Sequence, residues 1–319
     1  MTSTTPGRTI THYTVRGTTF PFEDPTGSIA RDAIPGQPYE PLVAALIDEA
    51  LRAGSASFAD VGALYGFFSC WAARHSPATR VVAFEPEPVH VEVLERNRRR
   101  TGSSFEIAQV ALSDRIGTLD FHGRTVEPED GFTPWRRDYV GAVRGSLVRR
   151  ASGRASAEDH VLLSSEGDGP RHSARSILGE TLRERRRPPA VADASHRVPA
   201  TTFDAWAEEH GFWPSVIKMD VHGGEGPALR GMPEVLRRAD HLLLELHTPD
   251  YLVDCTLEEV LDGVVSSGMA VYELRGFRRT RGRLVPLTPA RLRDLADTAT
   301  WSAEDLYAMK CLYATRTPL

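Results

Sequence analysis

The fold is decided by two stretches, SFADVGALYGFFSCWAARH (residues 57–75) and RVVAFEPEP (residues 80–88). Residues 57–62 predict a short buried strand that ends in a glycine turn, and residues 64–74 predict a helix. Residues 81–85 predict the next strand, after which Pro88 suits the first turn of a helix that ends near Gly102. Short apolar strands that alternate with helices are typical of a parallel sheet with helices on both faces.

The same alternation flanks a long segment without periodicity. Residues 105–112 predict a third strand, and residues 122–197 predict an insertion, either partly disordered or a lid that closes over a substrate. Beyond it, strands are predicted at 215–221, 241–247 and 270–274, with a hairpin partner at 283–287. The expected organisation is an N-terminal cap and helix (1–56), the two halves of one α/β domain (57–121 and 198–287), the insertion (122–197) and a C-terminal extension (288–319).

The composition narrows the class of protein. The 319 residues carry a formal net charge of −5, which gives no reason to expect a nucleic-acid partner. No apolar run approaches the ~20 residues of a membrane helix, and residues 1–8 lack the apolar core of a secretory signal. The three cysteines, Cys70, Cys255 and Cys311, show no metal-binding spacing. We therefore expect a soluble, cytoplasmic protein without a membrane partner.

One turn predicts a cofactor that contains a nucleoside. Asp60, Gly62 and Gly66 stand where the first strand meets its helix, and glycines there allow a ligand to approach the backbone closely. Glu85 ends the next strand, nineteen residues after Gly66, where a carboxylate can accept both hydroxyls of a ribose. The structural alternative is that the two glycines only permit tight packing and that Glu85 is a solvated strand end.

The glycine spacing separates two classes of cofactor. A dinucleotide fingerprint, G-x-G-x-x-G, needs its middle glycine to admit a pyrophosphate, whereas residues 62–66 read G-x-x-x-G. S-adenosylmethionine contains a ribose but no phosphate, and its positive charge suits the carboxylate of Asp60. The turn therefore favours methyl transfer, and an NAD-dependent oxidoreductase stays the alternative.

Several motifs together resemble the FkbM-type family of class I S-adenosylmethionine-dependent methyltransferases. They are YEP (39–41), DVGA (60–63), GFFS (66–69), VAFEP (82–86), VALSD (110–114) with Gly117, TFD (202–204), IKMDV (217–221) with Gly223 and Glu225, LRG (229–231) and LE (244–245). The resemblance covers about residues 39–121 and 200–275. It implies a Rossmann-like fold whose seven-stranded, mostly parallel sheet has an antiparallel last strand. The cofactor would lie at the carboxyl ends of the central strands.

The resemblance also implies which residues bind S-adenosylmethionine. The glycine turn would hold the methionine part, Glu85 the ribose, and residues 111–113 would lie beside the adenine. The full set of expected cofactor-binding residues is Asp60, Gly62, Ala63, Tyr65, Gly66, Glu85, Pro86, Ala111, Leu112, Ser113 and Asp220. The chain departs from the family at Leu64, where Asn is usual, and at His222, where Glu is usual.

The second departure predicts a catalytic role. A hydroxyl acceptor benefits from a base, and histidine titrates close to neutral pH, so His222 is the candidate base beside Asp220. His247, which ends the next strand, is a second candidate. No metal site is predicted, although Asp220 with His222 and Glu245 with His247 could each face one way and bind a divalent ion. The expected activity is O-methylation of a small molecule, such as a natural product or a sugar. The alternative is a non-catalytic protein that keeps the fold.

Overall fold

The computed structural model describes residues 10–27, 29, 38–121, 196–247, 249, 252–296 and 309–317. Nearly all of them belong to one compact unit, made of residues 1–121, 197–296 and 310–319. The predicted insertion at 122–197 lies outside the described residues except for its last two positions. None of the described helices is long and apolar enough to cross a membrane.

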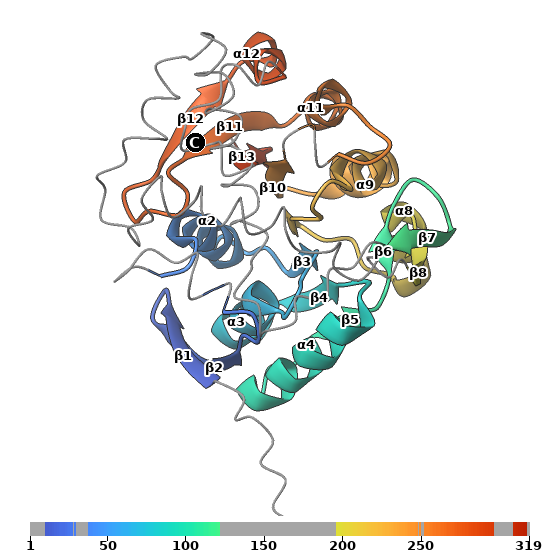
Figure 1. The fold of residues 1–319 in the computed structure, drawn as a ribbon. Helices are drawn as coiled ribbons and strands as arrows, with labels where there is room; N and C mark the ends of the chain where they lie inside the picture. Colours follow the sequence, from blue (N-terminus) through green and yellow to red (C-terminus); the bar gives the residue numbers. More distant parts are fainter. Residues whose placement is uncertain are drawn as a thin grey trace, which may run out of the picture. The chain divides into compact units, whose positions relative to one another are not determined.

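The main sheet has eight strands in the order β12-β11-β13-β10-β9-β3-β4-β5. Strands β10, β9, β3, β4 and β5 are mutually parallel, and β11 is antiparallel to both β12 and β13. The sheet is mostly parallel, as predicted, but has eight strands where seven were expected; the strand at its edge, β12, is the predicted hairpin partner of β11 (Figure 1). The bounds are β3 Ser57–Val61, β4 Arg80–Phe84, β5 Glu106–Ala108, β9 Val216–Met219, β10 His241–His247, β11 Ala270–Arg275, β12 Arg283–Leu287 and β13 Met309–Thr315.

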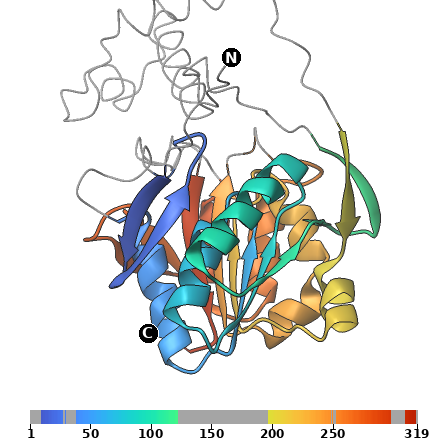
Figure 2. The ribbon, with the colours of Figure 1, turned by 90° about the horizontal axis from the view of Figure 1, so that it is seen from below.

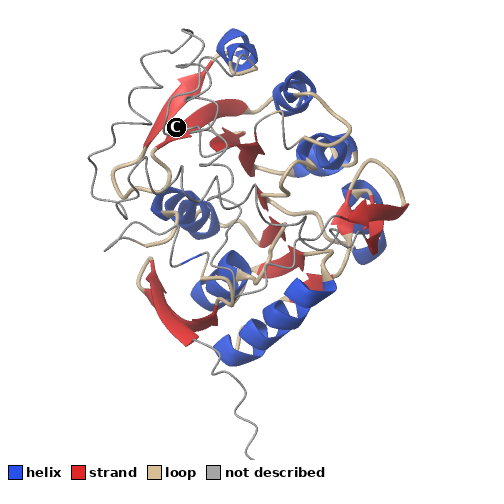
Figure 3. Cartoon of the chain, in the orientation of Figure 1, coloured by secondary structure: helices blue, strands red, loops and turns tan. Residues whose placement is uncertain are grey.

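Helices cover both faces of the sheet, as predicted. Figure 1 shows α2, α3 and α4 on one face and α8, α9 and α11 on the other, and Figure 3 shows the strands as the layer between them. Their bounds are α2 Pro41–Arg52, α3 Phe67–His75, α4 Pro88–Thr101, α8 Phe203–His210, α9 Glu225–Arg230, α10 Pro233–Arg238, α11 Leu257–Ser266 and α12 Pro289–Asp294. The local signals act as expected: proline opens α2 and α4, and Gly102 ends α4 in a left-handed conformation.

Two predicted elements have different bounds. Helix α3 begins at Phe67, because Leu64 (φ 51°) and Gly66 (φ 81°) are left-handed and cannot continue a right-handed helix. The predicted strand 105–112 is two short strands, β5 and β6 (Ala111–Leu112), in different sheets. Strand β6 pairs in parallel with β8 (His196–Thr201), in a small sheet that β7 (Gly117–Phe121) completes.

The structure adds detail at the two ends of the chain. The sequence left open whether the predicted C-terminal extension supplies a strand or a cap, and residues 309–315 form β13 between β10 and β11, with its described side chains buried. The N-terminal cap contains a hairpin of β1 (Ile10–Val15) and β2 (Thr18–Glu23) (Figure 2). Phe20 and Phe22 of this hairpin pack their rings against Phe67 of α3, with centroids 5.3 and 5.4 Å away.

A buried carboxylate also holds the hairpin to the helices. Asp48 of α2 is fully buried, and its oxygens accept from Arg16 Nε (2.8 Å) and Arg52 Nε (2.7 Å). His75 Nε2 lies 2.6 Å from the same carboxylate, and its Nδ1 bonds the hydroxyl of Thr18. These bonds and charges outweigh burial and lower the pKa of Asp48 to about 2.

Candidate functional site

The turn between β3 and α3 is held by contacts within the chain. Gly62 has φ +76°, and a Cβ there would lie 1.8 Å from the backbone oxygen of Asp220. Gly66 has φ +81°, and a Cβ there would lie 2.0 Å from Leu94 Cδ1 of α4. Packing inside the protein therefore accounts for both glycines. It also ties the turn directly to the segment that follows β9.

Glu85, by contrast, is not a solvated strand end. It is 5% exposed, and its Oε2 accepts the backbone N–H of Leu64 at 2.8 Å. Its Oε1 accepts the backbone N–H of Glu87 at 3.0 Å and lies 3.2 Å from His90 Nδ1. The carboxylate thus joins the end of β4 to the glycine turn. Two carboxylate oxygens offer about four acceptor positions, so the group has capacity left for a ligand.

Asp60 orders the start of α3. Its Oδ2 accepts from both the backbone N–H (3.0 Å) and the hydroxyl (2.6 Å) of Ser69, in the first turn of the helix. The side chain is 2% exposed, and burial raises its pKa despite those bonds and the charge of Lys218. Asp60 therefore acts as a cap for the helix as well as a negative charge at the turn.

On the other side of β3, the ends of β9 and β10 bring the predicted catalytic residues together. His222 Nδ1 lies 3.4 Å from Asp220 Oδ1, and His247 Nε2 lies 3.9 Å from the same oxygen. The two imidazole rings are 4.9 Å apart between centroids. Asp220 and His222 do not face the same way through the alternation of side chains along a strand, as the sequence suggested. β9 ends at Met219, before both residues, and His222 has a left-handed backbone (φ 49°). The side chain of His222 is 67% exposed, whereas that of His247 is buried.

Glu225 is a member of this cluster that spacing alone did not indicate. It is the first residue of α9 and is fully buried. Its Oε1 lies 2.8 Å from His247 Nδ1 and accepts the backbone N–H of Gly223 at 3.2 Å. Burial alone would lower the pKa of His247, but Glu225, Asp220 and Glu245 raise it to about 9. The only earlier signal for Glu225 was its place in the family motif.

A buried lysine and several carboxylates surround this cluster. Lys218 Nζ lies 3.8 Å from Asp220 Oδ2 and 5.3 Å from the ring centroid of Phe68. Although burial opposes the charge, Asp220, Glu245 and Glu40 keep the pKa of Lys218 above its usual value. Lys218 and Lys310 are the two lysines of the chain, and both are buried.

Glu40 and Glu245 stand out among these carboxylates. Both oxygens of Glu40 and Oε1 of Glu245 are buried and have no hydrogen-bond partner among the residues that the structure describes. Burial, and then the neighbouring negative charge, raises the pKa of both groups. In the sequence, Glu40 appeared only within the YEP motif, and Glu245 appeared in the LE motif and, with His247, as one possible pair of metal ligands.

The remaining residues predicted to bind the cofactor contact residues outside the Asp220 cluster. Tyr65 packs edge-on against His90, with centroids 5.4 Å apart, and Ser113 donates its N–H to the oxygen of Thr201. Ala111 and Leu112 form β6, where they pair with Ala200 and Thr201. Ala63 is buried, and its N–H donates to the oxygen of Phe84 at 3.0 Å, while Pro86 directly follows Glu85 and is half-buried.

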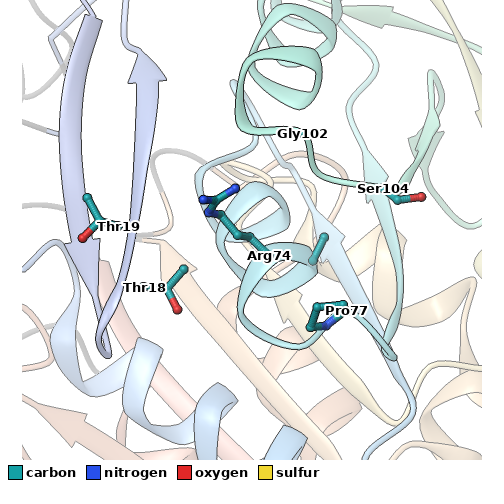
Figure 4. A pocket seen from close by; sticks show the side chains of 7 residues that line it. Thr18, Thr19, Arg74, Pro77, Gly102 and Ser104 are labelled. Atoms are coloured by element: carbon teal, nitrogen blue, oxygen red, sulfur yellow. The ribbon is translucent and has the colours of Figure 1, made fainter.

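A cavity elsewhere in the fold is not part of this cluster. The cavity has a volume of about 500 Å³. Figure 4 shows its lining residues at the carboxyl end of α3 and the end of α4, beside the start of β2. Because α3 leads into β4, that region lies at the amino ends of the strands. Ligands of open parallel α/β sheets bind at the opposite edge. Residues that line the cavity include Thr18, Thr19, Arg74, Pro77, Gly102 and Ser104.

A comparison with protein families identifies the family of this chain. The family model described as "Methyltransferase FkbM domain" matches residues 60–263, more than half of the chain. The chain belongs to the FkbM methyltransferase family. Its cofactor is therefore S-adenosylmethionine, as the family resemblance implied, and its class is that of the class I methyltransferases.

The cluster of carboxylates fits the charge of that cofactor. S-adenosylmethionine carries a positive sulfonium and a positive ammonium group. The buried oxygens of Glu40 and Glu245 that lack hydrogen-bond partners among the described residues, together with Asp60 and Asp220, give this edge of the FkbM domain carboxyl groups that could face the positive groups of the cofactor. Glu85 offers a fixed carboxylate of the kind that accepts ribose hydroxyls.

Individual relatives are more distant. The protein named AMB antimetabolite synthetase AmbE, from Pseudomonas aeruginosa, is 29% identical over 193 residues, which are 59% of this chain and 8% of that protein. A precorrin-6y C5,15-methyltransferase from Geobacter metallireducens GS-15 is 12% identical over 86% of each chain, with a TM-score of 0.36. A putative O-methyltransferase from Klebsiella pneumoniae is 11% identical over 91% of this chain and 87% of its own, with a TM-score of 0.36. Because both TM-scores are low, the fold class is assigned from the family match and the order of the strands.

Proposed function

We propose that this FkbM methyltransferase methylates a hydroxyl oxygen of a small molecule. One observation carries the proposal: the residues expected to accept the proton adjoin the cofactor turn. The backbone N–H of Asp220 donates to the oxygen of Val61 at 2.9 Å, and Gly62 packs against the oxygen of Asp220. A base at this position would face the acceptor beside the transferable methyl group. S-adenosylmethionine supplies an electrophilic methyl group, and the chain aligns the acceptor and removes its proton.

Within the cluster, His222 is the proposed proton acceptor. Its Nδ1 faces Asp220 Oδ1 at 3.4 Å, so a proton on Nδ1 would point at the carboxylate and leave Nε2 free to take a proton. Its exposed side chain can reach a bound molecule, whereas His247 is buried against Glu225. Asp220 would orient His222 and stabilise the imidazolium that forms.

Cofactor binding is proposed for the turn and for the residues near it. Glu85 would accept the ribose hydroxyls, Asp60 and the glycine turn would face the methionine part, and residues 111–113 would lie by the adenine. Asp220 belongs to both the cofactor site and the acceptor site in this proposal. For the acceptor class, the word antimetabolite in the name of the AmbE relative supports a natural product.

The first experiment tests the cofactor site. Purified protein is titrated calorimetrically with S-adenosylmethionine, S-adenosylhomocysteine and NAD, beside Glu85→Gln. Glu106→Gln is the matched control, because it changes a carboxylate on the neighbouring strand that pairs with Arg80. We expect both sulfur cofactors to bind, NAD not to bind, and Glu85→Gln alone to weaken binding. No binding of either sulfur cofactor by folded protein would contradict the proposal and favour a non-catalytic role.

The second experiment tests the chemistry. Deuterated-methyl S-adenosylmethionine is incubated with a panel of small molecules that offer hydroxyl, amine or thiol groups, and methylated products are identified by mass spectrometry. We expect products on hydroxyl oxygen, and we expect His222→Gln to lower kcat by about 10²–10⁴-fold without changing cofactor affinity. Products on nitrogen or sulfur would refute O-methylation while leaving methyl transfer intact.

A further inference from the structure

The atoms around Asp220 suggest more than a pair of hydrogen bonds. Asp220, His222 and His247 each contribute one potential ligand atom, and these atoms lie within 4.8 Å of one another. Bonds of about 2.0–2.2 Å from one ion to such ligands place the ligand atoms about 3.0–3.6 Å apart. The distance of 3.4 Å from Asp220 Oδ1 to His222 Nδ1 lies within that range, and the distance of 3.9 Å to His247 Nε2 is slightly longer. Ion binding would therefore need a small movement of the Asp220 side chain toward His247.

Direct hydrogen bonding explains the arrangement less well. Charge-assisted N–H···O bonds are about 2.7–2.9 Å long, and both imidazole nitrogens are farther than that from Asp220 Oδ1. This oxygen is buried and accepts no hydrogen bond from the described residues. A buried carboxylate oxygen set between two imidazole nitrogens at these distances has the geometry of a shared ion.

The surroundings of His247 supply an independent observation. A histidine that binds a metal usually donates its other ring N–H to a carboxylate, which fixes the ring and its tautomer. His247 has this partner, because its Nδ1 lies 2.8 Å from Oε1 of the fully buried Glu225. The bond leaves Nε2 turned toward Asp220. Gly223 N–H, 3.2 Å from the same Oε1, holds Glu225 in place.

The charges near the cluster allow a cation. Lys218 lies 3.8 Å from Oδ2 of Asp220, which leaves Oδ1 for an ion. Glu245, Glu40 and Asp60 also act on Lys218 and offset its positive charge. The ligand set of two imidazoles and one carboxylate suits transition metals such as Mn²⁺, Fe²⁺, Co²⁺ and Zn²⁺ better than Mg²⁺ or Ca²⁺.

We propose that Asp220, His222 and His247 bind one divalent transition-metal ion, with Glu225 as the outer partner of His247. Three protein ligands leave coordination positions open for water or for an oxygen of the acceptor. The role of this ion in methyl transfer rests on the proposed function. A bound ion would acidify a coordinated hydroxyl of the acceptor, whose proton would pass to solvent water, so His222 would be a ligand and not the base in the metal-loaded protein.

The test measures metal binding without any acceptor. Untagged full-length protein is stripped with a chelator and titrated with Co²⁺, followed by visible absorption, and with Mn²⁺ and Zn²⁺ by calorimetry. We expect one equivalent to bind. His222→Ala, at an exposed position that leaves folding intact, should lose the Co²⁺ bands. Glu225→Gln should weaken affinity about 10–100-fold. His12→Ala removes an exposed histidine of β1 and should change nothing.

The outcomes separate this proposal from the methyltransferase function. Absence of a Co²⁺ signal in protein that binds S-adenosylmethionine overturns the metal site and leaves His222 as a free base. A signal that survives both His222→Ala and Glu225→Gln places the metal elsewhere and also overturns the proposal. Metal binding that depends on His222, in protein that does not bind S-adenosylmethionine, supports the site and refutes the proposed function.

Discussion

Replacing Gly62 by alanine tests how the cofactor turn is joined to the catalytic segment. The substitution has two separate costs. Gly62 has φ +76°, and its added Cβ would lie 1.8 Å from the backbone oxygen of Asp220. The left-handed conformation costs about 1–2 kcal/mol for a residue with a Cβ. Forcing an extra carbon into a packed site costs about 1–3 kcal/mol. The expected loss in the free energy of unfolding is therefore about 2–5 kcal/mol.

Two other glycines isolate these costs. Gly102 has φ +63° and no atom within 4 Å of its would-be Cβ, so Gly102→Ala carries the conformational cost alone. Gly231 has an ordinary φ of −86°, but its Cβ would lie 1.9 Å from the oxygen of Ser113, so Gly231→Ala carries the steric cost alone. We expect losses of about 1–2 kcal/mol for Gly102→Ala and about 1–3 kcal/mol for Gly231→Ala.

The assay is urea unfolding of the three variants and the parent, followed by fluorescence and circular dichroism. The gain from restricting the unfolded chain is the same for each glycine-to-alanine change, so it cancels in the comparison. Gly62→Ala should cost about the sum of the other two changes, and it should weaken S-adenosylmethionine binding more than Gly102→Ala does. If Gly62→Ala costs no more than Gly102→Ala, the turn does not press on Asp220 and our account of the site's assembly is wrong.

Three further predictions concern stability. The pKa of Asp48 is lowered to about 2, so the ionised carboxylate stabilises the folded protein above pH ~4, and this contribution is lost as the pH falls toward 2. Asp48→Asn should therefore reduce the dependence of the free energy of unfolding on pH between 4 and 2, measured by urea unfolding at each pH. Lys310 Nζ lies 3.0 Å from Glu273 Oε1, and Arg275 Nε lies 2.9 Å from the other oxygen of Glu273. Because Arg275 stays as a partner of Glu273, Lys310→Met should cost about 1.5–3 kcal/mol in urea unfolding, and adding Glu273→Leu should restore part of it. Leu64 is left-handed (φ 51°), and Leu64→Asn should raise the thermal midpoint and stabilise by about 0.5–1 kcal/mol, whereas Leu64→Ala should not.

Local patterns in the sequence determined the class of fold. Short apolar runs that alternate with helices predicted the parallel sheet and the helices on its two faces. The prediction was possible because a buried strand and a half-buried helix each show a characteristic spacing of apolar residues in the sequence. Pro88 and Gly102 marked the two ends of α4. The position of Glu85 relative to the glycine turn is likewise a local property of one strand–helix–strand unit, and the structure adds the bond from Leu64 N–H that joins the two parts.

Only the tertiary structure decided how distant segments meet. β13 enters the sheet between β10 and β11, and nothing in a short apolar run specifies its neighbours. The pairing of β3 with β9 joins residues more than 150 positions apart, as the contact of Ser57 with Ser215 shows.

That pairing also assembles the candidate site. It brings Gly62 against Asp220, while the adjacent β10 carries His247 to Glu225. The sequence supplied Asp220, His222 and His247 as candidates. The distances between them, and the burial of Glu40 and Glu225 beside them, follow from the order of the strands. The sequence could not predict them, because the apolar pattern of one element does not show which other element lies beside it.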